Sequence, residues 1–281
     1  MKPKYSYLIA AALLVFASCQ KELSSEDMEI DGPPPPPDSN CFIDRVSQID
    51  TTAGVSVGYI GATFNADGRV TRIEDFDSIS LQYYTVIDMQ LKGDTIFLAD
   101  DEMFVVDGNK RVKEYILKAD PTDPQDFDLI MTYSYNAEGQ LLSKIAREPI
   151  TNTNYIEILY NWSGGNLSRI RFDIFGTNIY QADYEYHTDI SVNNFMYVFA
   201  DLFDSVFDLG LNLGKKPVNA VKKITISGVD PDDGQPFSGS TQFYNYKLSA
   251  NKQVQSYVVE NNILADFAIY AGKNQLRYKC F

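Results

Sequence analysis

Polar and apolar side chains alternate along most of the chain from residue 40 onward. The segments 133–135 and 184–186, for example, place a tyrosine at every second position. A period of two is typical of β-strands with one face buried, and short runs of Gly, Asn, Asp and Pro separate these segments as turns would. The pattern predicts a mainly β domain built from many short antiparallel strands.

A hairpin signal recurs within this region. It is clearest at 64–73, 135–145 and 160–170, with weaker copies at 106–115 and 246–257. In the clear copies an aromatic residue ends one strand, Asn opens the loop by bonding its own backbone, and Gly takes the positive φ that closes it. Each copy therefore predicts two antiparallel strands joined by a tight turn.

The spacing after each turn bears on how the sheet is covered. An apolar residue follows the turn and a second one comes three positions later, as in Val70 with Ile73 and Leu167 with Ile170. An offset of three places two residues on opposite faces of a regular strand. We therefore expect both faces to be partly apolar, in a large antiparallel meander, a curled sheet or a partly closed barrel.

One segment has helical rather than strand periodicity. Residues 193–209 carry apolar side chains at helical spacing, with Asn193 or Asn194 placed to cap the start and Gly210 or Gly214 to stop the end. The polar face bears Asp201, Asp204 and Asp208, where a helix lying on a membrane would carry basic residues. The pattern predicts one amphipathic helix that covers the sheet.

The chain begins with an export signal. Lys2 and Lys4 precede an apolar run at 5–16, which is too short to span a bilayer as a helix. The run ends in Ala17-Ser18-Cys19, which resembles a bacterial lipobox. We expect 1–18 to be a lipoprotein signal peptide and Cys19 to carry the acyl groups, the alternative being an ordinary secretory signal with a chance cysteine.

The next segment predicts a spacer. Residues 19–39 lack apolar periodicity, are rich in carboxylates and contain an unbroken proline run at 33–37, so we expect a disordered tether with a stiff polyproline end. Gln-Lys-Glu at 20–22 resembles the export tag of Bacteroidota surface lipoproteins. These features predict an outer-membrane lipoprotein, on the cell surface rather than the periplasmic face, with 40–281 as a single β domain.

Composition narrows the partners. The chain has 24 Lys and Arg against 38 Asp and Glu, so nucleic acid is not expected as a partner. One histidine, His187, supplies a zinc site poorly, and we expect no metal and no cofactor. Ser56 sits in a Gly-x-Ser-x-Gly string, but its strand-like context lacks the strand-to-helix turn that a nucleophile elbow needs. No catalytic residue is therefore predicted.

Two cysteines remain if Cys19 is acylated. Cys41 opens the folded region and Cys280 is the penultimate residue. An exported compartment is oxidising, so we expect the two to form a disulfide that joins the first strand to the last, the alternative being two unpaired thiols.

The hairpin motifs, the strand at 184–186 and the return at 215–225 resemble a Bacteroidota lipoprotein family of unknown function, described as having a porin-like, many-stranded β fold. The turns are also similar to the YD-type repeats of large surface proteins. The resemblance implies fold and location and carries no activity, cofactor or catalytic residue.

Two functional hypotheses remain open. The first is a non-catalytic binding or structural surface protein, with a glycan or a protein as partner. Its contact surface would be tyrosine-rich strand faces, although ordinary packing is an alternative role for those tyrosines. These tyrosines are Tyr133, Tyr135, Tyr184, Tyr186, Tyr244 and Tyr246. The second hypothesis is a glycan-directed envelope hydrolase that uses a pair of carboxylates, since carboxylates are plentiful.

Overall fold

A computed structural model describes residues 41–50, 52–119, 122, 128–147, 152–193, 195, 210–229, 234–260 and 271–281. The predicted signal peptide, Cys19 and the tether lie outside the described residues. So does the predicted helix at 193–209, except for Asn193 and Phe195. The described residues contain strands and no helix, which confirms the mainly β class.

Seventeen strands follow one another along the chain. They are β1 Cys41–Ile49, β2 Ser56–Phe64, β3 Val70–Asp77, β4 Gln82–Asp88, β5 Gln90–Lys92, β6 Thr95–Phe97, β7 Glu102–Val106, β8 Val112–Leu117, β9 Leu129–Tyr135, β10 Leu141–Arg147, β11 Asn154–Ser163, β12 Asn166–Ile174, β13 Thr177–Ser191, β14 Asn219–Val229, β15 Pro236–Leu248, β16 Val254–Glu260 and β17 Gly272–Cys280.

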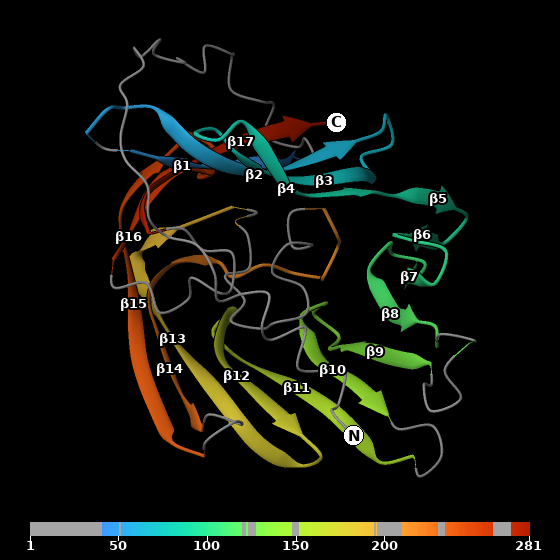
Figure 1. Cartoon of the computed structure of the whole chain (residues 1–281). Coiled ribbons are helices and arrows are strands. Elements are labelled where there is room, and N and C mark those ends of the chain that lie inside the picture. The colour runs from blue at the N-terminus through green and yellow to red at the C-terminus, as the bar shows by residue number, and fades with distance from the viewer. Residues whose placement is uncertain are drawn as a thin grey trace.

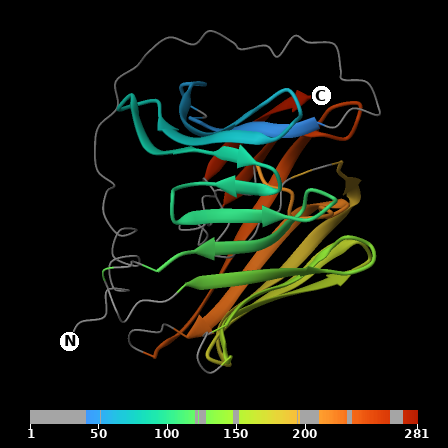
Figure 2. The ribbon, with the colours of Figure 1, turned by 90° about the vertical axis from the view of Figure 1, so that its right-hand side faces the viewer.

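These strands form one antiparallel sheet that is nearly closed into a barrel (Figures 1 and 2). Apart from β4 and β5, strands that are neighbours in the chain pair with each other, and β1 pairs with both β2 and β17. Among the described strands the ladder is interrupted between β4 and β5, which only Met89 separates: β4 pairs with β3, and β5 pairs with β6. If β4 and β5 are counted as one continuous strand, the barrel has 16 strands instead of 17. An even number is what a closed antiparallel ring requires.

The five predicted hairpins are all present, as β2–β3, β7–β8, β9–β10, β11–β12 and β15–β16. In the first, the Asn65 side-chain oxygen accepts hydrogen bonds from the backbone nitrogens of Asp67 and Arg69, at 3.0 and 2.9 Å. Gly68 has a φ of 72°. In the β7–β8 turn Asp107 accepts the equivalent hydrogen bonds, from the backbone nitrogens of Asn109 and Arg111. Asn136 accepts a bond from Gln140 N in the β9–β10 turn, so the expected turn chemistry is present in these three hairpins. In β11–β12 it differs, because Asn161 lies within the strand and Gly164 and Gly165 form the turn.

A bulge after every one of these turns corrects the prediction that both faces are apolar. In the β2–β3 pair Phe64 lies opposite Val70 but Thr63 lies opposite Arg72, so Thr71 is an extra residue. The other four hairpins skip one residue at the same place, namely Lys113, Leu142, Ser168 and Gln255. An extra residue reverses the phase of a strand. Val70 and Ile73 consequently both point inward and are 1% and 0% exposed.

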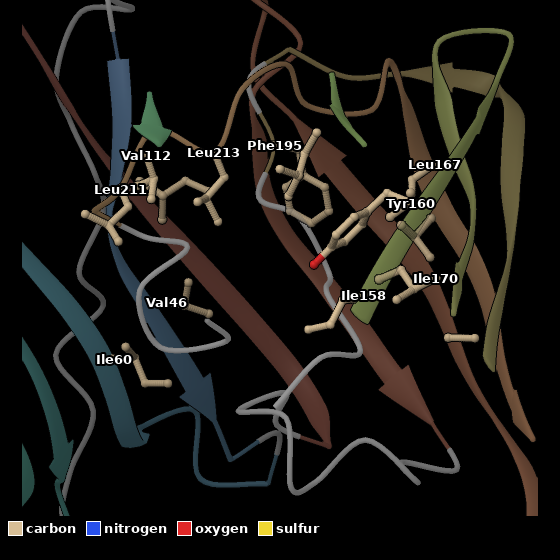
Figure 3. Packing of buried hydrophobic residues seen from close by; sticks show 14 of the residues in the cluster. Val46, Ile60, Val112, Ile158, Tyr160, Leu167, Ile170, Phe195, Leu211 and Leu213 are labelled. Carbon is tan, nitrogen blue, oxygen red and sulfur yellow. The ribbon is translucent and has the colours of Figure 1, made fainter. Parts of the chain in front are cut away.

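Strands all around the sheet contribute apolar side chains to one buried cluster. Figure 3 shows Val46, Ile60 and Ile158 converging from β1, β2 and β11. The connection from β13 to β14 adds to this core through Phe195, whose ring packs edge-on against Tyr257 at 5.7 Å. Leu213 of the same connection is fully buried. The described interior is therefore a packed core.

The predicted disulfide is present. Cys41 and Cys280 lie directly opposite each other in the β1–β17 pair and are bonded at 2.07 Å. The two strands pair along eight register positions from this bond to Ile49 and Lys273. The bond therefore joins the two ends of the described sheet where the barrel closes.

Candidate functional site

The recurring turns all lie at the same end of the barrel. In an antiparallel ring, strand direction alternates, so turns separated by an even number of strands share an end. The turns after β2, β7, β9, β11 and β15 satisfy this once β4 and β5 count as one. The start of β1 and the end of β17 lie there too, at the disulfide. We call this end the rim.

Residues 210–218, here called the strap, run across the rim. The strap's backbone bonds two turns, with Val112 N donating to Asn212 O at 2.9 Å and Lys215 N donating to Gly139 O at 2.8 Å. A third turn contacts it through Gly165, where a Cβ would lie 3.2 Å from the Val218 side chain. The strap is thus fixed to three of the five hairpin turns.

Between the strap and the turns lies a groove of about 1170 Å³. Turn residues, the start of β1 and the strap line it, and polar or charged side chains share the lining with apolar ones such as Val106 and Leu211. The charged lining residues are Asp67, Arg69, Lys110, Arg111, Glu138, Lys215 and Lys216. A concave surface of mixed polarity that gathers seven charged residues makes this groove the best candidate binding site in the described part of the molecule.

Arg111 is held rigidly in the groove wall. Asp107 accepts hydrogen bonds from its Nε and Nη2 at 2.9 and 2.7 Å, and the guanidinium lies 4.5 Å above the Tyr135 ring. Although burial raises the pKa of Asp107, hydrogen bonds from the backbone and side chain of Arg111 and from Asn109 N outweigh that effect and lower it. Asp107 is thus a fixed anion that orients Arg111.

Two further cations of the groove lie on neighbouring turns. Arg69 Nη1 donates to the Gly93 carbonyl oxygen at 2.9 Å, which links the β2–β3 and β5–β6 turns. Lys110 pairs with Asp94 at 3.0 Å. No single motif in the sequence marks Arg69 or Lys110 as a binding residue, although each lies in or directly after a recognised turn and the alternation of strand direction places those turns together.

The six tyrosines proposed as contact residues do not gather on one face. Tyr133 and Tyr184 are buried in the interior at 5% and 8% exposure. Tyr135, Tyr186 and Tyr246 pack against the same core. The hydroxyls of Tyr135 and Tyr246 donate to the carbonyl oxygens of Val112 and Val221.

Tyr244 is the exception, since it faces outward and bonds Glu260 through its hydroxyl. Five of the six tyrosines thus contribute packing, and Tyr135 alone reaches the groove wall, beneath Arg111.

Ser56 and His187 show no catalytic geometry. The Ser56 hydroxyl donates to Gly58 O at 3.1 Å, and the His187 ring nitrogen contacts Phe243 O at 3.1 Å. Across the described ranges, no cluster of three or more His, Cys, Asp or Glu side chains is arranged to hold a metal ion. Those ranges also contain no helix long and apolar enough to span a membrane.

Ion pairs lie at outward positions of several neighbouring strands. Asp44 of β1 pairs with Arg277 of β17 at 2.8 Å, and Arg169 of β12 pairs with Asp183 of β13 at 2.6 Å. Further pairs join β3 to β4 and β13 to β14. Exposed apolar side chains also occur on the strands, among them Tyr84 of β4 and Ile130 of β9.

The fold is similar to two solved structures. A porin-like protein from Bacteroides uniformis aligns with a TM-score of 0.55 and 13% sequence identity, covering 85% of this chain and 98% of that chain. A porin-like protein from Bacteroides vulgatus aligns with a TM-score of 0.50 and 14% identity, covering 85% of this chain and 99% of that chain.

No family model and no curated protein match the sequence. At these identities the structural similarity shows the fold, and it confirms the porin-like part of the expected resemblance. Membership of a lipoprotein family and the likeness to YD-type repeats stay predictions.

Proposed function

We propose that this chain is an exported outer-membrane lipoprotein, anchored through Cys19 and exposed on the cell surface, that binds a hydrophilic ligand in the rim groove without transforming it. The observation that carries the proposal is a groove of about 1170 Å³ at the rim that gathers seven charged residues from separate turns and the strap. A channel needs a polar lumen, whereas the described side chains that face the interior, such as Phe195 and Leu213, are mostly apolar. The rim is the concave surface where charged side chains gather.

The anchoring part of the proposal is supported by the sequence. The lipobox-like run before Cys19 and the tether at 19–39 would hold the barrel outside the membrane. The charged outward faces of the strands suit a domain surrounded by water. The Bacteroides origin of the similar structures is in keeping with this location.

Binding is tested by calorimetric titration of the lipoprotein in detergent against a panel of envelope and plant oligosaccharides. Glu138→Trp places a bulky ring on an exposed turn in the groove, while Thr132→Trp places the same ring on the exposed outward side of β9. We expect saturable binding that Glu138→Trp abolishes and Thr132→Trp preserves. Equal binding by both variants would locate the ligand elsewhere and refute the groove.

The same panel tests the absence of catalysis. Two carboxylates, Asp67 and Glu138, line the groove from different turns, and carboxylate pairs that hydrolyse glycans must lie within about 5–10 Å of each other. We expect no release of reducing sugar from any glycan in the panel. Turnover that is lost in Asp67→Asn or Glu138→Gln would establish the hydrolase instead.

A further inference from the structure

Resting on the proposed binding function, we propose that the rim groove selects anionic oligosaccharides, whose carboxylate, sulfate or phosphate groups are bound by arginine and lysine side chains of the turns and the strap.

The groove reverses the charge balance of the chain. Its lining has five cations, Arg69, Lys110, Arg111, Lys215 and Lys216, against two carboxylates. When the neighbouring Asp94 and Asp107 are added, the count is five cations to four carboxylates. The whole chain, by contrast, has 24 Lys and Arg residues against 38 Asp and Glu residues. In a concave surface such an excess concentrates anions while the rest of the molecule repels them.

Arg111 is positioned before any ligand arrives. Two of its nitrogens, Nε and Nη2, are bound by Asp107, and the Tyr135 ring supports the guanidinium plane. The third, Nη1, lies 3.6 Å from the position that a Cβ of Gly139 would take, so it faces the groove wall across that turn. A side chain fixed in this way loses little rotamer entropy on binding an oxyanion.

Arg69 is fixed by a neutral partner. Its Nη1 donates to the Gly93 carbonyl oxygen, and in the described part of the chain no carboxylate lies within ion-pair distance of its guanidinium. The turn therefore fixes the position of the guanidinium without neutralising its positive charge. Lys215 and Lys216 add charge from the strap, on the other side of the groove. A ligand that meets both sides must carry more than one anionic group.

The wall of the groove favours a sugar chain over a peptide. An extended peptide binds by adding a strand to a free sheet edge. Here the wall consists of turns whose backbone donors are already bonded to Asn65, Asp107 and Asn136. Recognition must go through side chains, and Asn109, Asn193 and Gln253 supply amides that can bond hydroxyl groups.

The test compares ligands that differ only in charge. The full-length lipoprotein in detergent is titrated with short oligogalacturonate and with the methyl-esterified form of the same oligomer. We expect the ester to bind about tenfold more weakly or worse, and the binding of the acid to weaken as salt is added. Inorganic phosphate and polyglutamate are the comparison probes, and each should bind at least about tenfold more weakly than oligogalacturonate.

Matched variants assign the effect to the groove. Removing three charges with Arg69→Gln, Lys215→Gln and Lys216→Gln together should weaken oligogalacturonate binding by about tenfold. Removing two charges from the outward face of β14 with Lys222→Gln and Lys223→Gln should change it less than about twofold. Far-ultraviolet circular dichroism of both variants checks that the barrel is folded.

The outcomes separate this inference from the binding function on which it rests. Neutral and acidic oligomers that bind equally, with both blocked by Glu138→Trp, would leave the groove as a binding site and refute its selection of anions. Tighter binding of polyglutamate would replace the sugar with an acidic peptide. Loss of binding in the control variant as large as in the triple variant would refute the groove as the source of selection. A panel in which nothing binds would refute both proposals.

Discussion

Breaking the Cys41–Cys280 bond should remove a large part of the stability of the barrel. The bond closes a loop with a sequence separation of 239. It therefore restricts almost the whole domain in the unfolded state. Reduction leaves both sulfur atoms in place, so a comparison of the oxidised and reduced chain isolates the cross-link from any change in packing.

The magnitude follows from the length of the loop. In the chain-entropy model a loop of this size contributes about 5.5 kcal/mol at 25 °C. A compact denatured state already restricts the chain, so the measured effect should be smaller, and we expect about 3–5 kcal/mol. Eight register pairs between β1 and β17 remain after reduction, so the barrel should still close. Typical stabilities are about 5–15 kcal/mol, which makes the loss easy to measure.

The assay is equilibrium unfolding in urea, followed by circular dichroism. The chain carries Cys19→Ser, so that no lipid and no third thiol is present. The midpoint should fall by more than about 1 M on reduction, with a steeper slope because the open chain exposes more surface. The variant with both Cys41→Ala and Cys280→Ala should match the reduced chain and be insensitive to reductant. A difference below about 1 kcal/mol between the oxidised and reduced chain would refute this reasoning.

Four further predictions concern other positions. Gly214→Ala should destabilise the protein in the same urea assay by about 2 kcal/mol or more, because its φ is 89° and a Cβ would collide with the Gly139 carbonyl oxygen. Gly108→Ala, whose Cβ would meet no atom within 4 Å, should be neutral, and equal losses would contradict this account. Cys19→Ala should abolish palmitate labelling, and undiminished labelling would exclude acylation there. Ser56→Ala should leave the turnover of a generic ester unchanged, and a loss would reveal a serine esterase. Burial, followed by the hydrogen bond to Glu74, raises the pKa of Tyr59 from 10.0 to about 12. Its stabilising contribution is therefore complete below pH 10 and lost as the pH rises towards about 12, and a Tyr59→Phe variant that unfolds over the same alkaline range as the wild type would contradict this role.

The fold was predictable because its signals are local. Three hairpins depend on an Asn or Asp that bonds its own loop, and all five have a residue with positive φ in the turn, features that can be read from a short stretch of sequence. The disulfide followed from counting thiols. Closure was harder to anticipate, because the β1–β17 pair joins residues more than 200 positions apart and no short motif specifies it.

The phase of the strands was mispredicted for a specific reason. An offset of three between Val70 and Ile73 places them on opposite faces only if the strand is regular, and the bulge at Thr71 places both inside. The corresponding bulge at Leu142 of β10 turns Lys144, three positions after Leu141, into the interior. There it is fully buried, with its Nζ 5.5 and 5.6 Å from the Tyr133 and Tyr160 rings. A recurring offset of three after a turn is therefore a signal for a bulge.

The groove was not predicted because its residues are ordinary turn residues one at a time. Arg69 and Arg111 each follow a turn, and charged residues are common there, so neither stands out in the sequence. Tyrosines were predicted to form the contact surface because they are large and frequent in the sequence. Yet Tyr133 and Tyr184 are buried in the apolar core, where large aromatic side chains bury much surface.

Strand parity links the repeats, the disulfide and the groove. Because strand direction alternates around the ring, the start of β1 with Cys41 and the end of β17 with Cys280 can meet only if the ring has an even number of strands. The number is even because β4 and β5 continue through Met89 as one strand. The same parity sends the recurring turns to the rim beside the disulfide. Inserting or removing a whole hairpin would preserve this arrangement, whereas inserting a single strand would carry Cys280 to the opposite end of the barrel. The disulfide therefore requires the parity that also brings turns from distant parts of the chain together around one groove.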